Sequence, residues 1–340
     1  AMRDFAKKYN IGNYFEVGRG GVCHQLMIEQ GFAAPGRLIV GADSHTCSYG
    51  ALGCFSTGIG STEAAAAMAT GKLWFKVPET QKFSVIGKLP KYSMGKDIIL
   101  KIIGDIGVDG ALYKAMEFYG ETIEGLSLSD RISISNMAIE AGGKAGIIPA
   151  DKKVDDYLKG RVRGSYKAVY ADKDADYCET FEYDAKEIPP MVAKPFLPEN
   201  VAPARELSNI EIDQAYLGSC TNGRIEDMRV AAKIMKGKKV KPGVRMLVVP
   251  ATKDVFEAAM KEGLIKIFMD ADAYVSGPTC GACLGGYMGV LAAGEKCISS
   301  TNRNFIGRMG HKDSEVYLAN PAVVAASAIT GRITDPNELE

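Results

Sequence analysis

The sequence has no excess of either charge and no long hydrophobic run. Its 41 Lys and Arg residues balance 41 Asp and Glu residues, so the formal net charge is zero. Nucleic-acid-binding proteins usually carry a basic excess, and proteins held electrostatically at membranes carry a polybasic patch. No stretch approaches the roughly 20 apolar residues that a transmembrane helix needs. We therefore expect neither a nucleic acid nor a membrane as a partner.

Cysteine and histidine are also scarce. Eight cysteines among 340 residues are too few for a disulfide-stabilised secreted fold, and no signal peptide is recognisable. We therefore expect a cytoplasmic protein whose clustered cysteines bind metal rather than pair as disulfides. Only three histidines are present, and two of them lie in densely polar surroundings.

What the sequence does contain is a regular alternation of strand-like and helix-like segments. Apolar runs bounded by glycine predict strands at 37–42, 82–87, 212–217, 244–249 and 273–275. Helical patterns predict helices at 61–70, 96–106, 226–235, 255–261 and 322–329. The first of these helices is rich in alanine, and we expect it to be buried. The alternation is typical of an α/β fold in which helices cover mixed sheets.

The length predicts two or three domains. Pro78 follows the alanine-rich helix, and five prolines between residues 189 and 203 are incompatible with a helix or a central strand. We therefore predict three units, at 1–80, 81–195 and 196–340, with the proline-rich stretch as a linker.

Three cysteines lie in two glycine-rich loops that each follow a predicted strand. Cys280 and Cys283 form a C-x2-C motif, and Cys220 lies in the segment Gly-Ser-Cys-Thr-Asn-Gly. Ligands of open α/β sheets collect beyond the carboxyl ends of the strands, so the three thiols can face one pocket. The remaining cysteines are interpreted as structural: Cys23, Cys47, Cys54, Cys178 and Cys297.

Four interpretations of the three thiols remain open: unrelated buried or redox-active thiols, a thioredoxin-like dithiol, a structural zinc site and an iron–sulfur cluster. A thioredoxin-like motif starts a helix beside an aromatic residue, and the glycine-rich loop does not resemble that. Structural zinc usually takes four ligands. A cluster is usually held by four cysteines, and three would leave one iron free to bind substrate as a Lewis acid.

Polar side chains gather around the two histidines. Asp43, Ser44 and His45 directly follow the strand predicted at 37–42, and in extended backbone Asp43 and His45 would share one face. His24 lies in a short amphipathic stretch, where a buried structural histidine is the commoner alternative to a catalytic one.

Two further motifs combine amides, a carboxylate and arginines. Asn136 and Glu140 are four residues apart, so they would share one face of a helix, although a solvated face is the ordinary alternative. Asn302, Arg303 and Arg308 lie near one predicted turn. Because Arg grips carboxylates at two points, the functional interpretation is an anion clamp, and the alternative is surface charge.

Taken together, these motifs resemble those of the aconitase superfamily. The matching stretches occur in the family's order, at 43–60, 136–140, 218–222, 280–283 and 302–308. The resemblance is closest to the large subunits of the family's two-subunit dehydratases, which act on 2-isopropylmalate or on homocitrate. It implies three α/β domains around a 4Fe–4S cluster at their junction, with Cys220, Cys280 and Cys283 each ligating one iron.

The same resemblance implies a reaction and roles for nine polar residues. Water would be removed from a 2-hydroxy di- or tricarboxylic acid and returned at the neighbouring carbon. Two pairs would be catalytic, Asp43 with His24 and Glu140 with His45, because an acid fixes the tautomer of its histidine and tunes it for proton transfer. The substrate-binding residues would be Ser44, Asn136, Arg303 and Arg308, and Asn302 would lie against the cluster.

The resemblance also implies a partner. A single-chain aconitase continues into a swivelling fourth domain, whereas this sequence stops after the third, so we expect a separate small subunit that carries the swivelling domain. The family's amino-terminal segment also lies outside this sequence. Two hypotheses of other classes stay open: an RNA-binding relative without a cluster, which zero net charge disfavours, and a zinc-stabilised scaffold.

Overall fold

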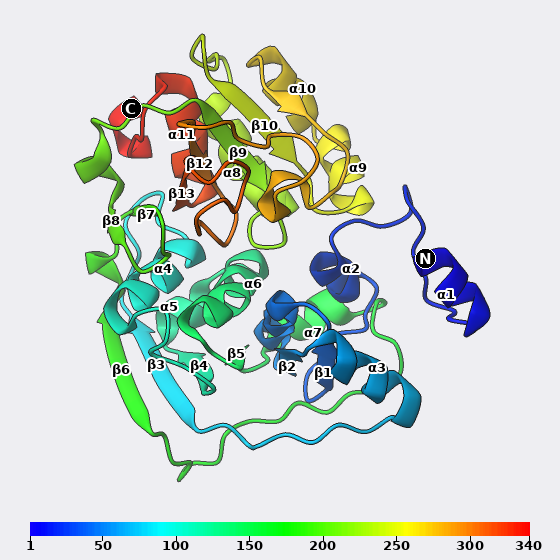
Figure 1. Cartoon of the computed structure of the whole chain (residues 1–340). Coiled ribbons are helices and arrows are strands. Elements are labelled where there is room, and N and C mark those ends of the chain that lie inside the picture. The colour runs from blue at the N-terminus through cyan, green and yellow to red at the C-terminus, as the bar shows by residue number, and fades with distance from the viewer.

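Three β-sheets covered by helices make up the computed structural model, which describes residues 1–340 (Figure 1). The sheets have two, four and seven strands. The α/β class predicted from the sequence is confirmed. None of the helices combines the length and the apolar character that crossing a membrane would require.

The two-stranded sheet and its neighbours come from the first 70 residues. Its parallel strands β1 (Leu38–Gly41) and β2 (Phe55–Gly58) are joined by the 3-10 helix η1 (Ser44–Leu52), which is almost wholly buried. The other elements are α1 (Met2–Lys8), α2 (Cys23–Glu29) and α3 (Ser61–Thr70). The predicted helix at 61–70 is confirmed, but no residue of α3 is buried. Its alanines favour the helix by propensity alone, and burial cannot be deduced from them.

The four-stranded sheet is parallel throughout, in the order β5-β4-β3-β6. Phe83 of β3 stacks on Phe181 of β6 with ring centroids 4.8 Å apart, and the isoleucines of α4 fill the same core. The elements are β3 (Thr80–Ile86), α4 (Gly95–Ile106), β4 (Ala115–Tyr119), α5 (Glu121–Gly125), α6 (Leu128–Met137), η2 (Ala138–Ala141), β5 (Ala145–Ile147), α7 (Lys152–Leu158) and β6 (Glu179–Asp184).

The seven-stranded sheet has the order β11-β10-β9-β12-β13-β7-β8, with only β7 and β8 antiparallel to their neighbours. Its strands are β7 (Met191–Ala193), β8 (Val201–Pro203), β9 (Gln214–Gly218), β10 (Arg245–Val249), β11 (Tyr274–Val275), β12 (Lys296–Ser299) and β13 (Glu315–Ala319). Its helices are η3 (Ala185–Glu187), η4 (Ala204–Leu207), α8 (Ile225–Met235), α9 (Lys253–Lys261), α10 (Leu264–Asp270), η5 (Gly281–Leu284), α11 (Pro321–Thr330) and η6 (Pro336–Leu339).

The proline-rich stretch predicted as a linker forms β7 and β8. Pro203 is tolerated because β8 is the edge strand. β7 lies before residue 195 and pairs with β13, so the seven-stranded sheet includes a strand from the range that we had given to the second unit. The three unit boundaries themselves stay predictions.

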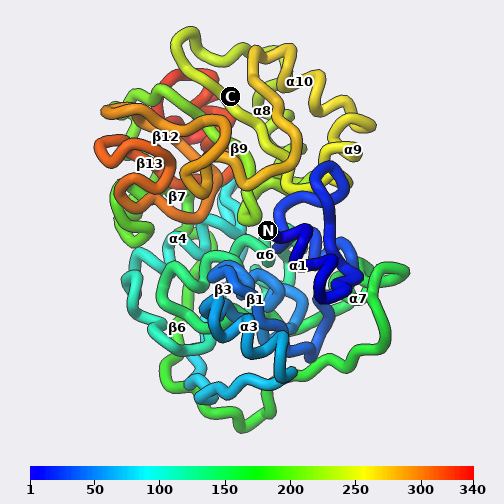
Figure 2. Tube along the Cα trace, turned by 45° about the vertical axis from the view of Figure 1, so that its right-hand side comes forward, coloured from blue at the N-terminus to red at the C-terminus, as the bar shows by residue number.

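Helix α6 lies in the middle of the molecule, below the seven-stranded sheet and beside η1 (Figures 1 and 2). Ser133 on α6 donates to the carbonyl oxygen of Thr221, just after β9, at 2.7 Å. Asn136 Nδ2 donates to Ser48 Oγ in η1 at 2.8 Å. Helix α6 therefore links the carboxyl end of β9 to η1.

Candidate active site

Three thiols lie beyond the carboxyl ends of β9 and β11. Cys220 and Cys283 are buried and Cys280 is half-buried. Asn302 contacts two of them, with Nδ2 3.5 Å from Cys220 Sγ and Oδ1 3.7 Å from Cys283 Sγ. Burial, followed by the proximity of Cys283, raises the pKa of Cys280 to about 11 and that of Cys220 even further. The two predicted loops therefore do bring their thiols together.

The three thiols are compatible with an iron–sulfur cluster. No group of three or more His, Cys, Asp or Glu side chains converges closely enough to hold one metal ion. In a cluster each thiolate binds its own iron, so the ligands need not converge on one point. A hydrogen-bond donor to one of the thiolates is present, because Asn136 Nδ2 lies 3.3 Å from Cys220 Sγ. Burial raises the pKa of Cys283 and the neighbouring Arg308 opposes that rise, while the buried Nε of Arg308 has no hydrogen-bond partner.

The backbone of both loops adopts conformations that side chains rarely allow. Gly281, between Cys280 and Cys283, has a φ of +54°, and a Cβ there would lie 2.3 Å from Tyr216 Oη. Ser219, before Cys220, has a φ of +92°, which is uncommon for a residue with a side chain. Such outliers gather at functional sites, where the surrounding structure enforces them.

Both predicted histidines hydrogen-bond a carboxylate. His24 Nε2 lies 2.8 Å from Asp43 Oδ1, and His45 Nε2 lies 2.9 Å from Glu140 Oε1. This is the pairing that the resemblance implied. The prediction of extended backbone from Asp43 to His45 was wrong, because Asp43 caps η1 and accepts from the backbone N–H of His45 at 2.8 Å. The cap turns the chain so that Nδ1 of His45 lies 3.4 Å from the same Asp43 oxygen.

The pair of His24 and Asp43 is an ion pair at neutral pH. Burial disfavours a charged imidazole, but the hydrogen bond to Asp43 and a smaller interaction with Cys23 outweigh burial and raise the pKa of His24 to about 9. Hydrogen bonds from His24 and His45 hold the pKa of Asp43 well below its usual range. The other ring nitrogen of His24, Nδ1, lies 3.1 Å from Tyr49 Oη.

Glu140 is shared between His45 and an arginine. Arg303 Nε donates to Glu140 Oε1 at 2.8 Å, and Arg303 Nη2 donates to Ser44 Oγ at 3.0 Å. Asn136 lies near the end of α6 and Glu140 lies in η2, because α6 gives way to η2 after Met137. Both side chains contact η1, Asn136 through Ser48 and Glu140 through His45. Both are buried, so neither belongs to a solvated helix face.

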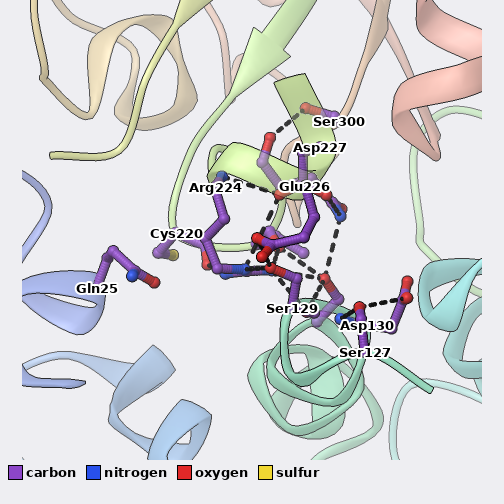
Figure 3. A network of polar contacts seen from close by, with 12 residues as sticks. Gln25, Ser127, Ser129, Asp130, Cys220, Arg224, Glu226, Asp227 and Ser300 are labelled. Atoms are coloured by element: carbon purple, nitrogen blue, oxygen red, sulfur yellow. Dashed lines mark hydrogen bonds and ion pairs between the residues drawn. The ribbon is translucent and has the colours of Figure 1, made fainter. Parts of the chain in front are cut away.

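The two arginines of the predicted clamp have different neighbours. Arg303 is engaged by Glu140 and Ser44, and Arg308 lies beside Cys283. Two buried cations at the site were missed by sequence reasoning. Lys96 donates to the carbonyl oxygens that precede Asn302, and Arg224 donates to the carbonyl oxygen of Cys220 (Figure 3). The only available signal was the position of Arg224, directly after the Gly-Ser-Cys-Thr-Asn-Gly segment.

Residues 1–209 and 200–331 match the family model described as the aconitase family (aconitate hydratase). This chain belongs to the aconitase family. Its relatives include the protein named 3-isopropylmalate dehydratase large subunit in Thermodesulfovibrio yellowstonii, which is 61% identical over 99% of this chain and 80% of the relative. The protein of the same name in Halothermothrix orenii is 60% identical over the same shares of the two chains.

Among solved structures, the holo form of aconitase X from Thermococcus kodakaraensis is similar to this aconitase-family chain. The TM-score is 0.46 at 13% sequence identity, with 80% of this chain and 62% of that chain covered. The family assignment rests instead on the family model and on the relatives, and it confirms the resemblance that five motifs indicated. Membership of the aconitase family implies an iron–sulfur cluster.

Proposed function

We propose that this chain is the large subunit of a 3-isopropylmalate dehydratase, which interconverts 2-isopropylmalate and 3-isopropylmalate by loss and return of water in leucine synthesis. The observation that carries the proposal is 61% identity, over 99% of this chain, to a large subunit with that name. The neighbouring thiols and the two His–acid pairs support the proposal. The site would lie at the junction of units 1–80, 81–195 and 196–340.

Cys220, Cys280 and Cys283 would hold a 4Fe–4S cluster. When bound, the cluster supplies Lewis acidity towards the hydroxyl group and one carboxylate of the substrate. Three features support the fit of these residues to a cluster. They are the three neighbouring thiols, the amide donors of Asn136 and Asn302 near Cys220, and the unpartnered Nε of Arg308.

The polar residues of the chain orient the site and hold a proton. Hydrogen bonds and ion pairs run without a break through Tyr49, His24, Asp43, His45, Glu140, Arg303 and Ser44. His24 carries a proton at neutral pH, and the carboxylates on either side of His45 fix its orientation. A proton held in this series of hydrogen bonds can be supplied to a departing hydroxyl group.

The same chain of contacts prepares the groups that would bind substrate. Glu140 and Ser44 occupy Nε and Nη2 of Arg303, so Nη1 remains for a substrate carboxylate. Arg308, beside Cys283, would bind the second carboxylate. Holding both carboxylates keeps the geometry of the substrate between loss and return of water.

We also propose a small-subunit partner. The relatives are named large subunits, and both histidines of the site are already paired with carboxylates. A small subunit with the swivelling domain would supply that base and further cations, and it would control water at the site.

The test combines cluster assembly with activity. The chain, reconstituted anaerobically with iron and sulfide, should turn brown, and the colour should be lost in Cys220→Ser, Cys280→Ser and Cys283→Ser. Cys178→Ser is the matched control, since Cys178 is exposed and remote from the site. A brown Cys220→Ser protein would contradict the ligand assignment.

Activity is followed as formation of the unsaturated intermediate, with and without a 3-isopropylmalate dehydratase small subunit. We expect turnover of 2-isopropylmalate only with the partner. Preference for homocitrate would instead favour a homoaconitase large subunit, and full activity of the large subunit alone would contradict the two-subunit proposal.

A further inference from the structure

Arg224 joins the loop of Cys220 to helix α6. Its side chain is buried, with only 3% of the residue exposed. Nη1 donates to the carbonyl oxygen of Cys220 at 2.8 Å, and Nη2 donates to that of Thr221. On α6, Ser133 Oγ lies 2.8 Å and the carbonyl oxygen of Ser129 lies 2.9 Å from Nη2, so these two acceptors and Thr221 share its two hydrogens. Nε donates to Ser129 Oγ at 3.1 Å (Figure 3).

The turn at residues 219–222, which Arg224 contacts, also forms hydrogen bonds with α6. Ser133 Oγ donates to the carbonyl oxygen of Thr221 at 2.7 Å and accepts from Asn222 Nδ2 at 3.1 Å. Ser219 at the start of the turn has an unfavourable positive φ, so the turn needs outside contacts to keep its shape. Without Arg224, the buried carbonyl of Cys220 would lose this donor.

Only the planar fork of an arginine matches this set of acceptors. Three nitrogens of Arg224 reach acceptors in the turn and on α6, whereas a lysine offers three donors on one atom. The buried Asp227 lies 3.9 Å from Nε and accepts from the backbone N–H of Arg224. The charge of the guanidinium is therefore balanced within the protein, and its donors remain directed at the turn.

We propose that Arg224 is the positioning residue of the cluster site, which fixes the turn at Cys220 so that its thiol faces Asn136, Asn302 and Cys283. The inference rests on the proposed ligation by Cys220. Residues that orient metal ligands typically account for about 10- to 100-fold in metal affinity or activity.

Arg131 shows what a purely structural buried arginine looks like in this chain. It lies on α6 and is as buried as Arg224, but it donates to Ile123, Glu124 and Asp151, away from the thiol loops. Arg131→Lys is therefore the matched control for Arg224→Lys.

A milder pair of variants uses two serines of α6. Ser133→Ala removes the hydroxyl that contacts the turn and Arg224. Ser135→Ala removes an equally buried hydroxyl that has no hydrogen-bond partner, so it is the control. A single hydroxyl is a small enough loss for both proteins to fold.

The experiment measures the rate at which a chelator removes the cluster from each anaerobically reconstituted full chain. It also measures the rate of alkylation of Cys220 in the cluster-free protein, by mass spectrometry. We expect Arg224→Lys to lose its cluster about 10- to 100-fold faster than the wild type, with a smaller increase in Ser133→Ala and none in the two controls. Cys220 should be alkylated faster in the same two variants.

Equal rates of cluster loss in Arg224→Lys and Arg131→Lys would overturn the inference, and so would equal rates in Ser133→Ala and Ser135→Ala. The serine pair decides the matter if Arg224→Lys does not fold. A wild-type chain that takes up no cluster would refute the proposed function instead. The alkylation rates would then still show whether Arg224 holds the turn.

Discussion

Replacing Asp43 by Asn removes the charge that keeps His24 protonated. The amide oxygen of Asn can still accept from the backbone N–H of His45, so the cap of η1 is preserved. Burial of His24 remains, and burial disfavours the imidazolium. In Asp43→Asn the pKa of His24 should therefore fall from about 9 to below its ordinary value of 6.5.

The rise in the pKa of His24 stabilises the folded protein only while His24 is protonated. An increase from 6.5 to about 9 corresponds to about 3 kcal/mol, fully present below pH 6.5 and lost as the pH rises through about 9. At pH 7 most of this stabilisation, about 2–3 kcal/mol, remains. The free energy of unfolding of Asp43→Asn should be lower than that of the wild type by this amount at pH 7, and the two should converge near pH 10.

The assay is straightforward because the chain has only three histidines. Carbon-13 labelling of histidine gives three imidazole signals in the cluster-free protein, and His311→Gln identifies one of them. We expect one signal to titrate near pH 9 in the wild type and below pH 6.5 in Asp43→Asn, while urea titrations give the stabilities. A wild-type His24 signal that titrates between pH 6 and 7, or a stability difference independent of pH, would refute the reasoning.

Three further predictions concern other parts of the site. Arg308→Lys should lower the turnover of the complete two-subunit enzyme by about 100-fold, because Lys lacks the two-point grip on a carboxylate; steady-state kinetics near the wild-type values would contradict this. Gly281→Ala should prevent cluster assembly, measured as iron per chain, because its Cβ would meet Tyr216 Oη, whereas Gly277→Ala has open space and should assemble normally. Lys96→Met should lower the urea midpoint by the equivalent of about 1–3 kcal/mol, because two buried carbonyl groups lose their hydrogen-bond donor. An unchanged midpoint would show that these carbonyl groups have found another donor.

The elements with a clear pattern could be read from the sequence. The strand patterns at 37–42, 82–87 and 244–249 lie over β1, β3 and β10, and the helix pattern at 61–70 coincides with α3. The short strand β12 (Lys296–Ser299) was not expected. Four residues show no useful alternation, and β12 is a strand because β9 and β13, remote in sequence, flank it.

The site was predictable where a motif places its residues on one local element. The loops of Cys220 and Cys283 follow strands as expected. The contacts of Asn136 and Glu140 could not be deduced from their spacing, because spacing does not reveal where an α-helix tightens into a 3-10 helix. Arg224 was missed because its burial depends on acceptors from α6, almost 100 residues earlier in the chain.

The spread of the site along the chain sets the order in which its parts become available during synthesis. Cys220 precedes Cys283 by 63 residues. At a synthesis rate of about 5–20 residues per second, Cys283 is therefore added about 3–13 seconds after Cys220. Arg224 follows within four residues and its partners on α6 are already made. The turn can thus be anchored before the other thiols exist, whereas a site with all three thiols is available only once Cys283 has been made.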